Sequence, residues 1–286
     1  MDRMELRHAV AAVATGVCAV HVCRLAYAYC RTSSRSRVLG VIPARYESSR
    51  FPGKPMVLIA GKPMIVRTYE QAKQATSLTR LVVATDDVRI RDVCVAAGAE
   101  VVMTDSNIPN GTERCEAAMN LLSLKTKFDI VVNIQGDEPL IEPEIIDSCV
   151  RALQTAPDAV YSTPVTPFVD LKEVTMPSRV KCVVDRNGYA VYFSRGMIPN
   201  NKKGVPDLKH EYLLHLGLQA YDAKFLTVYG KLPPTPCMLQ EDLEQLKVLE
   251  HGFKMKVVKV EHSAHGVDEP GDVASIEAIL KTKGLK

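Results

Sequence analysis

The sequence lacks the patterns that mark several common classes of protein. It contains no Cys-x-x-Cys pair among its 8 cysteines and no Gly-x-Gly-x-x-Gly motif. These absences argue against a zinc site or a disulfide framework and against a dinucleotide-dependent dehydrogenase. No internal repeat or low-complexity tract is present, and no Ser/His/Asp or Cys/His arrangement suggests a covalent nucleophile. The net charge of +3 is too small to predict a nucleic-acid partner.

A long hydrophobic run is also missing. Residues 9–23 carry no formal charge, and Arg24 separates them from a second apolar run at residues 25–30. Each run is shorter than the roughly 20 residues that cross a bilayer, although snorkelling of Arg24 would join them into one membrane anchor. A cleaved targeting peptide is the alternative for residues 1–37, since these residues are rich in arginine and poor in acids. In an anchor, the arginines up to Arg37 would leave the rest of the chain in the cytosol.

From Val38 onward, the pattern is that of one α/β domain over residues 38–286. With 47% hydrophobic residues the chain can build a large core, and Cys94, Cys115 and Cys149 fall at apolar helix positions within it. Four strand–loop–helix units come first and predict a doubly wound, mostly parallel central sheet with helices on both faces. The predicted strands are 38–42, 80–84, 101–102 and 129–134, and the predicted helices are 63–75, 88–97, 111–124 and 143–153. Asp86 and Asp87 can cap the second of these helices, and Asn110 with Glu113 has the spacing of a capping box at the start of the third.

After about residue 158 the pattern changes to a smaller antiparallel insertion, at about residues 180–215. Asp185-Arg-Asn-Gly188 predicts a tight hairpin between strands 180–184 and 189–193. A strand at 217–221, a last strand at 255–260 and a final helix from Pro270 follow. The spacing of four leucines predicts one amphipathic helix that ends at Gly252. These leucines are Leu239, Leu243, Leu246 and Leu249.

The loop after the first strand is the strongest functional signal. It reads Pro43-Ala-Arg-Tyr-Glu-Ser-Ser-Arg-Phe-Pro-Gly-Lys-Pro55 and holds three cations, Arg45, Arg50 and Lys54. Prolines stiffen the loop, and Gly53 permits close approach of the backbone to a ligand. Ligands of open α/β sheets bind at the carboxyl ends of strands, so the three cations predict a polyanion there, most simply a triphosphate. The alternative is a basic surface loop in solvent.

Two aspartates are candidates for a magnesium site beside that triphosphate. Asp137 follows a buried strand in Gln135-Gly-Asp-Glu-Pro139, and Asp268 precedes the final helix in Gly266-Val-Asp-Glu-Pro270. Magnesium binds one or two carboxylates together with water and phosphate. A turn residue at Asp137 and a helix cap at Asp268 are the alternatives.

The cationic loop closely resembles the N-terminal signature of the 3-deoxy-manno-octulosonate cytidylyltransferases, the CMP-Kdo synthetases. Related sugar-activating transferases carry Gly-x-Gly-Thr-Arg-Leu in this place, and CMP-sialate synthetases share Pro-Ala-Arg but continue differently. Further motifs run in order to the C-terminus, and the extended N-terminus is similar to a membrane-anchored form found in plants. These motifs are Val-Ala-Thr-Asp (83–86), Gly-Thr-Glu-Arg (111–114), Gln-Gly-Asp-Glu-Pro (135–139), Tyr-Phe-Ser-Arg (192–195), His-Leu-Gly (215–217), Leu-Glu-Gln-Leu (243–246) and Gly-Val-Asp-x-Pro (266–270).

The resemblance implies a Rossmann-like nucleotidyltransferase fold and a role for each matched residue. It implies catalytic residues Arg45, Lys54, Asp137 and Asp268, of which Asp137 and Asp268 would bind Mg²⁺. It implies a CTP site of Pro43, Ala44, Arg45, Arg50, Lys54, Thr85, Asp86, Arg114 and Gln135. It implies a sugar side of Arg195, His215, Glu244 and Gln245.

The sugar-side residues also have structural alternatives. Arg195 could end a strand in solvent, His215 could be a structural histidine, and Glu244 and Gln245 could be exposed helix residues beside the leucines.

The implied activity is transfer of CMP from CTP to the anomeric hydroxyl of 3-deoxy-manno-octulosonate (Kdo), without a covalent enzyme intermediate. The alternatives are a CMP-sialate type of nucleotidyltransferase and a non-catalytic, membrane-tethered nucleotide-binding protein. The resemblance also implies a homodimer. We further expect an anchor in the mitochondrial outer membrane with the catalytic domain facing the cytosol, with an endomembrane or cytosolic location as the alternative.

Overall fold

A computed structural model describes residues 35–47, 51–124, 126–262, 266–267, 269–282 and 284. Contacts divide the chain between Arg35 and Ser36, two residues before the predicted boundary. The predicted anchor or targeting segment therefore lies outside the described residues, apart from residues 35–37. Within the described ranges, no helix is both long enough and apolar enough to cross a bilayer.

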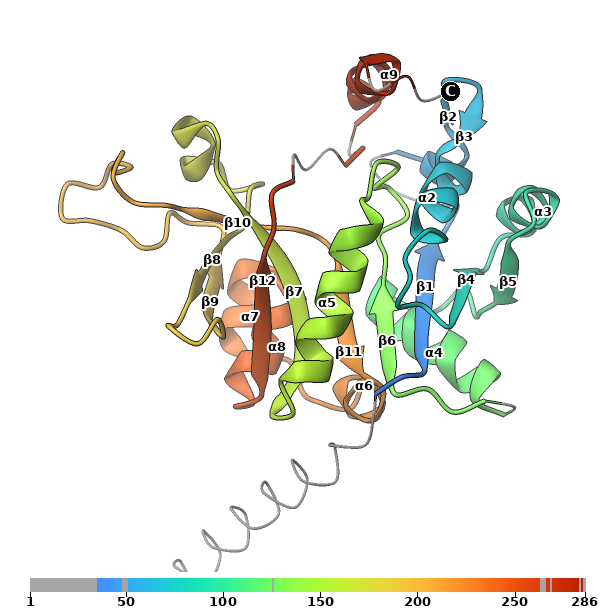
Figure 1. Cartoon of the computed structure of the whole chain (residues 1–286), viewed down its shortest axis with the longest axis horizontal. Helices are drawn as coiled ribbons and strands as arrows, with labels where there is room; N and C mark the ends of the chain where they lie inside the picture. Colours follow the sequence, from blue (N-terminus) through green and yellow to red (C-terminus); the bar gives the residue numbers. More distant parts are fainter. Residues whose placement is uncertain are drawn as a thin grey trace, which may run out of the picture. The chain divides into compact units, whose positions relative to one another are not determined.

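Ten strands of the described residues form one mixed sheet in the order β5-β4-β1-β6-β11-β7-β10-β8-β9, with β12 paired to β7 (Figure 1). Their bounds are β1 Val38–Ala44, β4 Arg80–Thr85, β5 Glu100–Met103, β6 Ile130–Asn133, β7 Ala159–Pro167, β8 Lys181–Val184, β9 Ala190–Ser194, β10 Leu213–His215, β11 Gln219–Asp222 and β12 Lys254–Lys259. A second sheet pairs β2 (Leu58–Ile59) with β3 (Lys62–Pro63).

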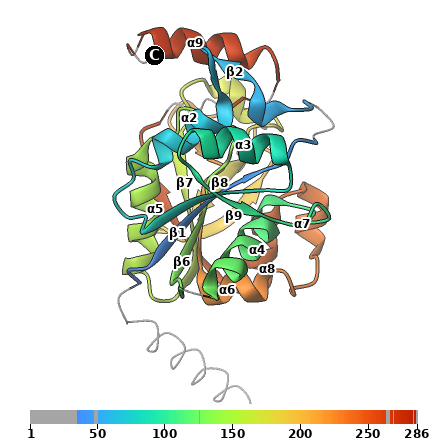
Figure 2. The same ribbon diagram turned by 90° about the vertical axis from the view of Figure 1, so that its right-hand side faces the viewer.

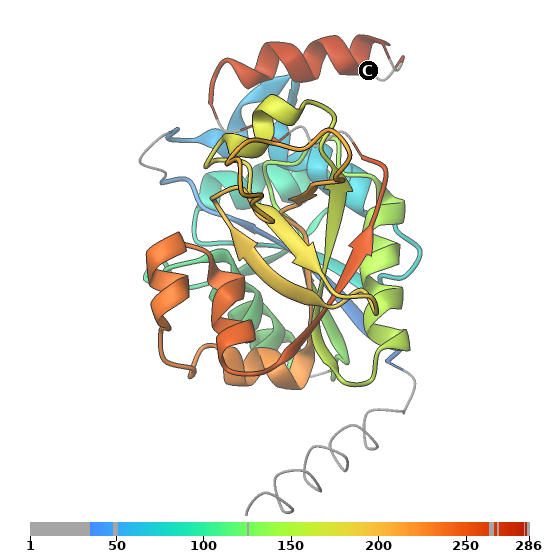
Figure 3. The ribbon, with the colours of Figure 1, turned by 90° about the vertical axis from the view of Figure 1, so that its left-hand side faces the viewer.

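The predicted fold class is confirmed. Strand β1 runs parallel to β4 and β6, and β4 runs parallel to β5. The antiparallel part begins at β11, which pairs with β6 and β7, and ends in the predicted hairpin of β8 and β9. Figure 3 shows this hairpin, in yellow, crossing beside β12. Because both parts belong to one sheet, the carboxyl ends of β1 and β6 lie near the antiparallel part, which begins at β11 beside β6.

Strand β7 is a long element that the sequence analysis did not predict. Eight of its nine residues are buried, and it pairs with β10, β11 and β12. Pro164 and Pro167 interrupt its sequence, and prolines inside a run argue against a central strand. Pro164 has no N–H to donate, but its carbonyl still accepts the N–H of Leu216 at 3.1 Å. The short strand β10 was missed together with β7.

Helices cover both faces of the sheet (Figure 2). One face carries α2 (Met64–Ala72), α3 (Val88–Ala96) and α5 (Pro143–Thr155), and the other carries α4 (Gly111–Ser123), α6 (Ala223–Tyr229) and α8 (Glu244–Glu250). Alternate residues of β1 enter the two cores, Val38 and Ile42 on one side and Leu39 and Val41 on the other. A strand buried on both faces reads as a continuous apolar run, which is how β1 was recognised.

The predicted core cysteines are buried, and burial raises the pKa of the Cys94 thiol to about 11.

The single leucine-striped helix was predicted wrongly. The structure has two short helices, α7 (Pro236–Glu241) and α8, separated by Asp242 in the left-handed region at φ 50°. Leu239 points to solvent with 67% exposure, whereas Leu243 and Leu246 are buried. The four leucines therefore do not share one face. Gly252, at φ 76°, follows α8 as predicted.

The C-terminal helix α9 (Asp272–Thr282) packs with the β2–β3 hairpin in a third apolar cluster. Ile276 and Leu280 of α9 join Ile59, Met64 and Val267 in this cluster. The N–H of Val267 donates to the carbonyl of Asp137 at 2.9 Å. The segment that leads into α9 is thereby attached to the turn after β6.

Candidate active site

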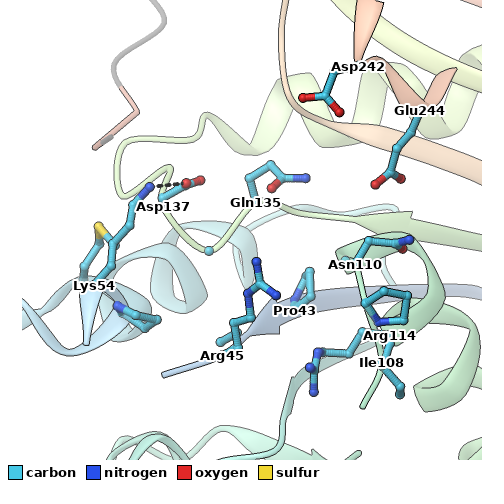
Figure 4. Close-up of a pocket in the computed structure, with 16 residues that line it drawn as sticks. Pro43, Arg45, Lys54, Ile108, Asn110, Arg114, Gln135, Asp137, Asp242 and Glu244 are labelled. Carbon is cyan, nitrogen blue, oxygen red and sulfur yellow. Dashed lines mark hydrogen bonds and ion pairs between the residues drawn. The ribbon is translucent and has the colours of Figure 1, made fainter. Parts of the chain in front are cut away.

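A cavity of about 620 Å³ lies at the carboxyl ends of β1 and β6 (Figure 4). Cations and prolines of the β1 loop form one wall, the start of α4 forms a second, and carboxylates near the start of α8 form a third. Its lining consists of Pro43, Ala44, Arg45, Lys54, Pro55, Met64, Ile108, Pro109, Asn110, Gly111, Arg114, Gln135, Gly136, Asp137, Asp242 and Glu244.

The cationic wall brings two of the three predicted triphosphate cations, Arg45 and Lys54, to the cavity. Arg45 directly follows β1 and directs its guanidinium into the cavity (Figure 4). Lys54 begins a short 3-10 helix, Lys54–Met56, after Gly53 at φ 72°. The Gly53 N–H donates to the Tyr46 carbonyl at 2.9 Å, which closes the loop. Glycine adopts this positive φ without the steric cost that other residues pay.

Lys54 and Asp137 meet inside the cavity. The ammonium of Lys54 lies 2.6 Å from Oδ2 of Asp137, and the two side chains are 15% and 33% exposed. The preceding Gly136 lies close to the β1 loop, since an added Cβ would lie 3.2 Å from the Pro43 carbonyl. The two βα turns therefore pack too closely for a larger residue. A carboxylate and a cation that remain partly open to the cavity can both bind ligand groups.

The cationic loop is fastened to the next βα unit. The guanidinium carbon of Arg89 lies 3.3 Å from the ring centre of Tyr46, while a Cβ at Gly53 would lie 3.2 Å from the same ring. Arg89 also pairs with Asp87 at 2.6 Å, and this pairing lowers the pKa of the Asp87 carboxyl. Asp87 caps α3, as the sequence predicted. Tyr46 is thus packed between its own loop and the start of α3.

The start of α4 forms the second wall. Asn110 caps this helix by accepting the N–H of Glu113 at 2.8 Å, which confirms the predicted cap. Arg114 lines the cavity with only 3% of its side chain exposed. It donates to Thr104 at 2.6 Å and to Asp86 at 3.2 Å. Thr85 and Asp86, predicted to bind CTP, are outside the cavity lining; Thr85 is fully buried and accepts the N–H of Asp87.

The third wall carries Asp242 and Glu244, whose carboxylates face the cationic side across the cavity (Figure 4). Glu244 accepts a hydrogen bond from the Thr112 hydroxyl at 2.9 Å. Burial raises the pKa of Glu244, while the Thr112 hydrogen bond opposes that rise. Glu244 was predicted from sequence, but Asp242 was not, because its place depends on the break between α7 and α8.

Two other predicted sugar-side residues, His215 and Gln245, lie near each other outside the cavity lining. His215 accepts or donates a hydrogen bond with Thr163 at 2.8 Å, and its Nδ1 lies 3.5 Å from Nε2 of Gln245. Burial lowers the pKa of His215 to about 4, so the ring is neutral near pH 7. Neither His215 nor Gln245 belongs to the cavity lining.

Arg195 is tied to the α7–α8 turn. Its guanidinium donates to the carbonyls of Glu241 at 2.7 Å, Asp242 at 3.1 Å and Pro177 at 3.2 Å. It does not line the cavity. Its observed contacts hold the segment that carries Asp242 and Glu244.

The remaining predicted residues, Arg50 and Asp268, lie outside the described residues. No group of three or more His, Cys, Asp or Glu side chains suited to a metal occurs in the parts of the chain that are described. Of the two predicted magnesium ligands, Asp137 is the one that the structure describes, and its carboxylate lines the cavity beside Lys54.

An α/β sheet whose first strand ends in a proline-stiffened cationic loop, with an aspartate at the next parallel strand, defines a nucleotidyltransferase. Comparison with known proteins identifies which kind of nucleotidyltransferase the chain resembles. Residues 39–259 match the family model described as cytidylyltransferase.

Two plant proteins and one solved structure are similar over most of the chain. The mitochondrial 3-deoxy-manno-octulosonate cytidylyltransferase of Arabidopsis thaliana is 59% identical over 251 residues, which is 88% of this chain and 86% of the relative. The enzyme of the same name from Zea mays is 57% identical over 262 residues, or 91% and 87% of the two chains. A CMP:2-keto-3-deoxy-manno-octonic acid synthetase complexed with CTP superposes with a TM-score of 0.80 at 35% identity, covering 87% of this chain and 100% of that one. The chain belongs to the 3-deoxy-manno-octulosonate cytidylyltransferase family.

Proposed function

We propose that the protein transfers CMP from CTP to the anomeric hydroxyl of Kdo, giving CMP-Kdo and pyrophosphate. The observation that carries this proposal is the cavity itself, in which a cationic wall with Arg45 and Lys54 faces a wall with Glu244. Its volume of about 620 Å³ is in the range of small-molecule sites, typically about 300–1,000 Å³. Two relatives, from Arabidopsis and maize, are named as Kdo cytidylyltransferases, and the similar synthetase was solved with CTP. These similarities support the choice of both substrates.

The nucleotide occupies the side formed by the β1 loop. Arg45 and Lys54 bind phosphate oxygens, since guanidinium and ammonium groups are strong donors to phosphate. Gln135 and Arg114 provide polar groups deeper in the cavity for the cytidine. Arg50 keeps its predicted place in the CTP site as part of this proposal. Asp86 acts through Arg114, whose guanidinium donates to it at 3.2 Å, while the fully buried Thr85 supports the turn by accepting the N–H of Asp87.

Asp137 is the residue that would hold Mg²⁺, with Asp268 as the second predicted ligand. The position of Val267, whose N–H is bonded to the Asp137 carbonyl, supports this pairing. Bound magnesium would neutralise phosphate charge while pyrophosphate leaves. Lys54 lies at 2.6 Å from Asp137 and binds the same group of phosphates.

The sugar occupies the side next to α8. The Glu244 carboxylate accepts hydrogen bonds from sugar hydroxyls, and Arg195, His215 and Gln245 support that side from behind. The C2 hydroxyl forms a bond to the α-phosphorus of CTP as the bond to pyrophosphate breaks, and its proton passes to solvent. No enzyme residue becomes covalently attached.

The test is pyrophosphate release with CTP and magnesium in the presence of Kdo, sialate or no sugar. We expect release with Kdo alone, and UTP in place of CTP should give much slower turnover. Release with sialate would indicate the other class of cytidylyltransferase. CTP binding without pyrophosphate release for any sugar would contradict a catalytic role.

The N-terminal residues are proposed to place the enzyme on a mitochondrial membrane, with the body facing the cytosol. A relative named as mitochondrial supports the organelle, and the uncharged run at residues 9–23 supports the anchor. Removal of residues 1–35 keeps Arg37, which pairs with Asp129 at 2.9 Å. The truncated enzyme should remain active and leave the membrane fraction.

We also propose a homodimer, and sedimentation of the same truncated enzyme tests that state.

A further inference from the structure

Glu244 depends on a hydroxyl from a distant part of the chain. It starts α8, where Leu243 provides no side-chain cap. Its Oε2 accepts from the Thr112 hydroxyl at 2.9 Å, and the two residues are 132 positions apart. Thr112 is 2% exposed and lies in the first turn of α4. A buried threonine in a helix often bonds its own backbone, whereas this one bonds a carboxylate at the cavity.

A second hydroxyl stands behind the first. The Tyr221 hydroxyl lies 3.2 Å from Oγ1 of Thr112, and Tyr221 is 2% exposed. A hydroxyl donates one hydrogen and accepts others. Because Glu244 takes the Thr112 hydrogen, the Tyr221 hydroxyl donates to the Thr112 oxygen. The order of donation is therefore Tyr221 to Thr112 to Glu244.

The rest of the surroundings leave the carboxylate few other partners. Tyr229 donates its hydroxyl to the backbone carbonyl of Glu244 at 3.2 Å and also interacts with the Glu244 side chain, so it helps to place the start of α8. Lys247 places its ammonium 3.9 Å from the centre of the Tyr229 ring and interacts with Glu244 only through its charge. The negative charges of Glu113 on α4 and Asp242 before α8 also act on Glu244.

We infer that Thr112 is a positioning residue for sugar binding: its hydroxyl, held by Tyr221, fixes the Glu244 carboxylate with its other oxygen toward the cavity. This inference rests on the proposed function, because it assigns Glu244 to the sugar side. A carboxylate fixed in advance loses less rotamer freedom when the sugar binds. Loss of the hydroxyl should therefore lower kcat/KM for Kdo and leave the KM for CTP unchanged.

The experiment compares Thr112→Val, which keeps the shape but removes the hydroxyl, with Thr112→Ser, which keeps the hydroxyl. We expect kcat/KM for Kdo to fall by about 10-fold or more in the valine variant, since a hydrogen bond to a charged group has this order of effect. The KM for CTP should change less than about 2-fold. Thr112→Ser should remain within about 3-fold of the wild type.

A matched control is Thr166→Val. Thr166 is also a buried threonine, 4% exposed, but its hydroxyl donates to the His262 carbonyl at 3.1 Å and is outside the cavity lining. The control should leave both KM values unchanged. Should Thr112→Val not fold, Thr112→Ala removes the same hydroxyl without adding volume. In a Glu244→Ala background, either substitution should have no further effect on the sugar.

The pH profile provides a readout that loss of packing alone would not change. The Thr112 hydrogen bond lowers the pKa of Glu244, so its removal raises that pKa. The acidic limb of kcat/KM for Kdo should therefore shift to higher pH in the valine variant. Thr112→Ser should keep the wild-type limb.

Three results would overturn the inference while leaving the proposed function intact. They are wild-type kinetics in Thr112→Val, equal losses for CTP and Kdo, and a serine variant as impaired as the valine variant. A wild-type enzyme that releases no pyrophosphate with CTP and Kdo would overturn the proposed function and this inference together.

Discussion

The two sides of the cavity are built in different ways. The cationic wall comes from one continuous segment, in which Arg45 and Lys54 lie nine positions apart on either side of a closed loop. The acidic wall comes from a break between two short helices and is held by Arg195, which follows β9, and by Thr112 from α4. A local segment can position charges by its own turn residues. The acidic side depends on contacts between segments far apart in the sequence.

Asp137→Asn should produce the largest effect, because it removes the charge that faces Lys54 and would hold magnesium. We expect pyrophosphate release in magnesium to fall by about 1,000-fold, the order seen when a main electrostatic group is lost. CTP binding, measured by calorimetry, should be partly retained. Asp242→Asn makes the same chemical change on the opposite wall and should reduce turnover far less. Equal effects of the two substitutions would mean that the two walls do not have separate roles in the reaction.

The stability of the protein should depend on pH through His215, one of the predicted sugar-side residues. Burial lowers the pKa of His215 from 6.5 to about 4. The unfolded chain therefore binds a proton at His215 below about pH 6.5, while the folded protein binds one only near pH 4. The free energy of unfolding should decrease as the pH falls through this window, by at most about 3 kcal/mol from this residue. Urea unfolding of His215→Gln should show a flatter dependence, and an equal slope would contradict this role.

Arg195→Ala should release the turn that carries the acidic wall. Loss of charge-assisted hydrogen bonds to three carbonyls should cost about 2 kcal/mol of stability, and the melting temperature should fall by roughly 5 °C. The KM for Kdo should rise, because Asp242 and Glu244 follow the freed turn. Arg186→Ala, at an exposed hairpin arginine, is the control. A raised KM for Kdo at unchanged melting temperature would favour direct contact of Arg195 with the sugar.

Tyr46→Leu should have the smallest effect, because it loosens only the attachment of the cationic loop. Removing the ring ends its contact with Arg89, which is worth about 0.5–1 kcal/mol at an exposed site. The KM for CTP should rise by about 2- to 5-fold, and the KM for Kdo should stay constant. Tyr46→Phe keeps the ring and should behave as the wild type. A leucine variant with wild-type kinetics would show that the loop is rigid without this contact.

The sequence predicted the parallel half of the fold, and it predicted that Arg45 and Lys54 lie together at the end of β1. The apolar run of β1, the caps Asp87 and Asn110, and Gly53 all act within a few residues of the structure that they specify. Such local signals can be read directly from the amino-acid order.

The antiparallel half was harder to predict because neighbouring segments override the local pattern. Strand β7 contains two prolines and is recognisable only from its partners β10, β11 and β12. The leucine spacing at residues 239–249 suggested one helix, yet Asp242 interrupts it with a left-handed residue. The polar run Gln240-Glu-Asp242 was the available signal for that break. The contact between Thr112 and Glu244 has no counterpart in any local pattern.

The kinetics of Lys54→Met and Glu244→Gln, measured side by side, test the division of the cavity most directly. Each substitution removes one charge from one wall while keeping a side chain of similar size. Our account predicts that Lys54→Met raises the KM for CTP and not that for Kdo, and that Glu244→Gln does the reverse. If both variants raised the KM of the same substrate, the two walls would not serve separate substrates and the account would be contradicted.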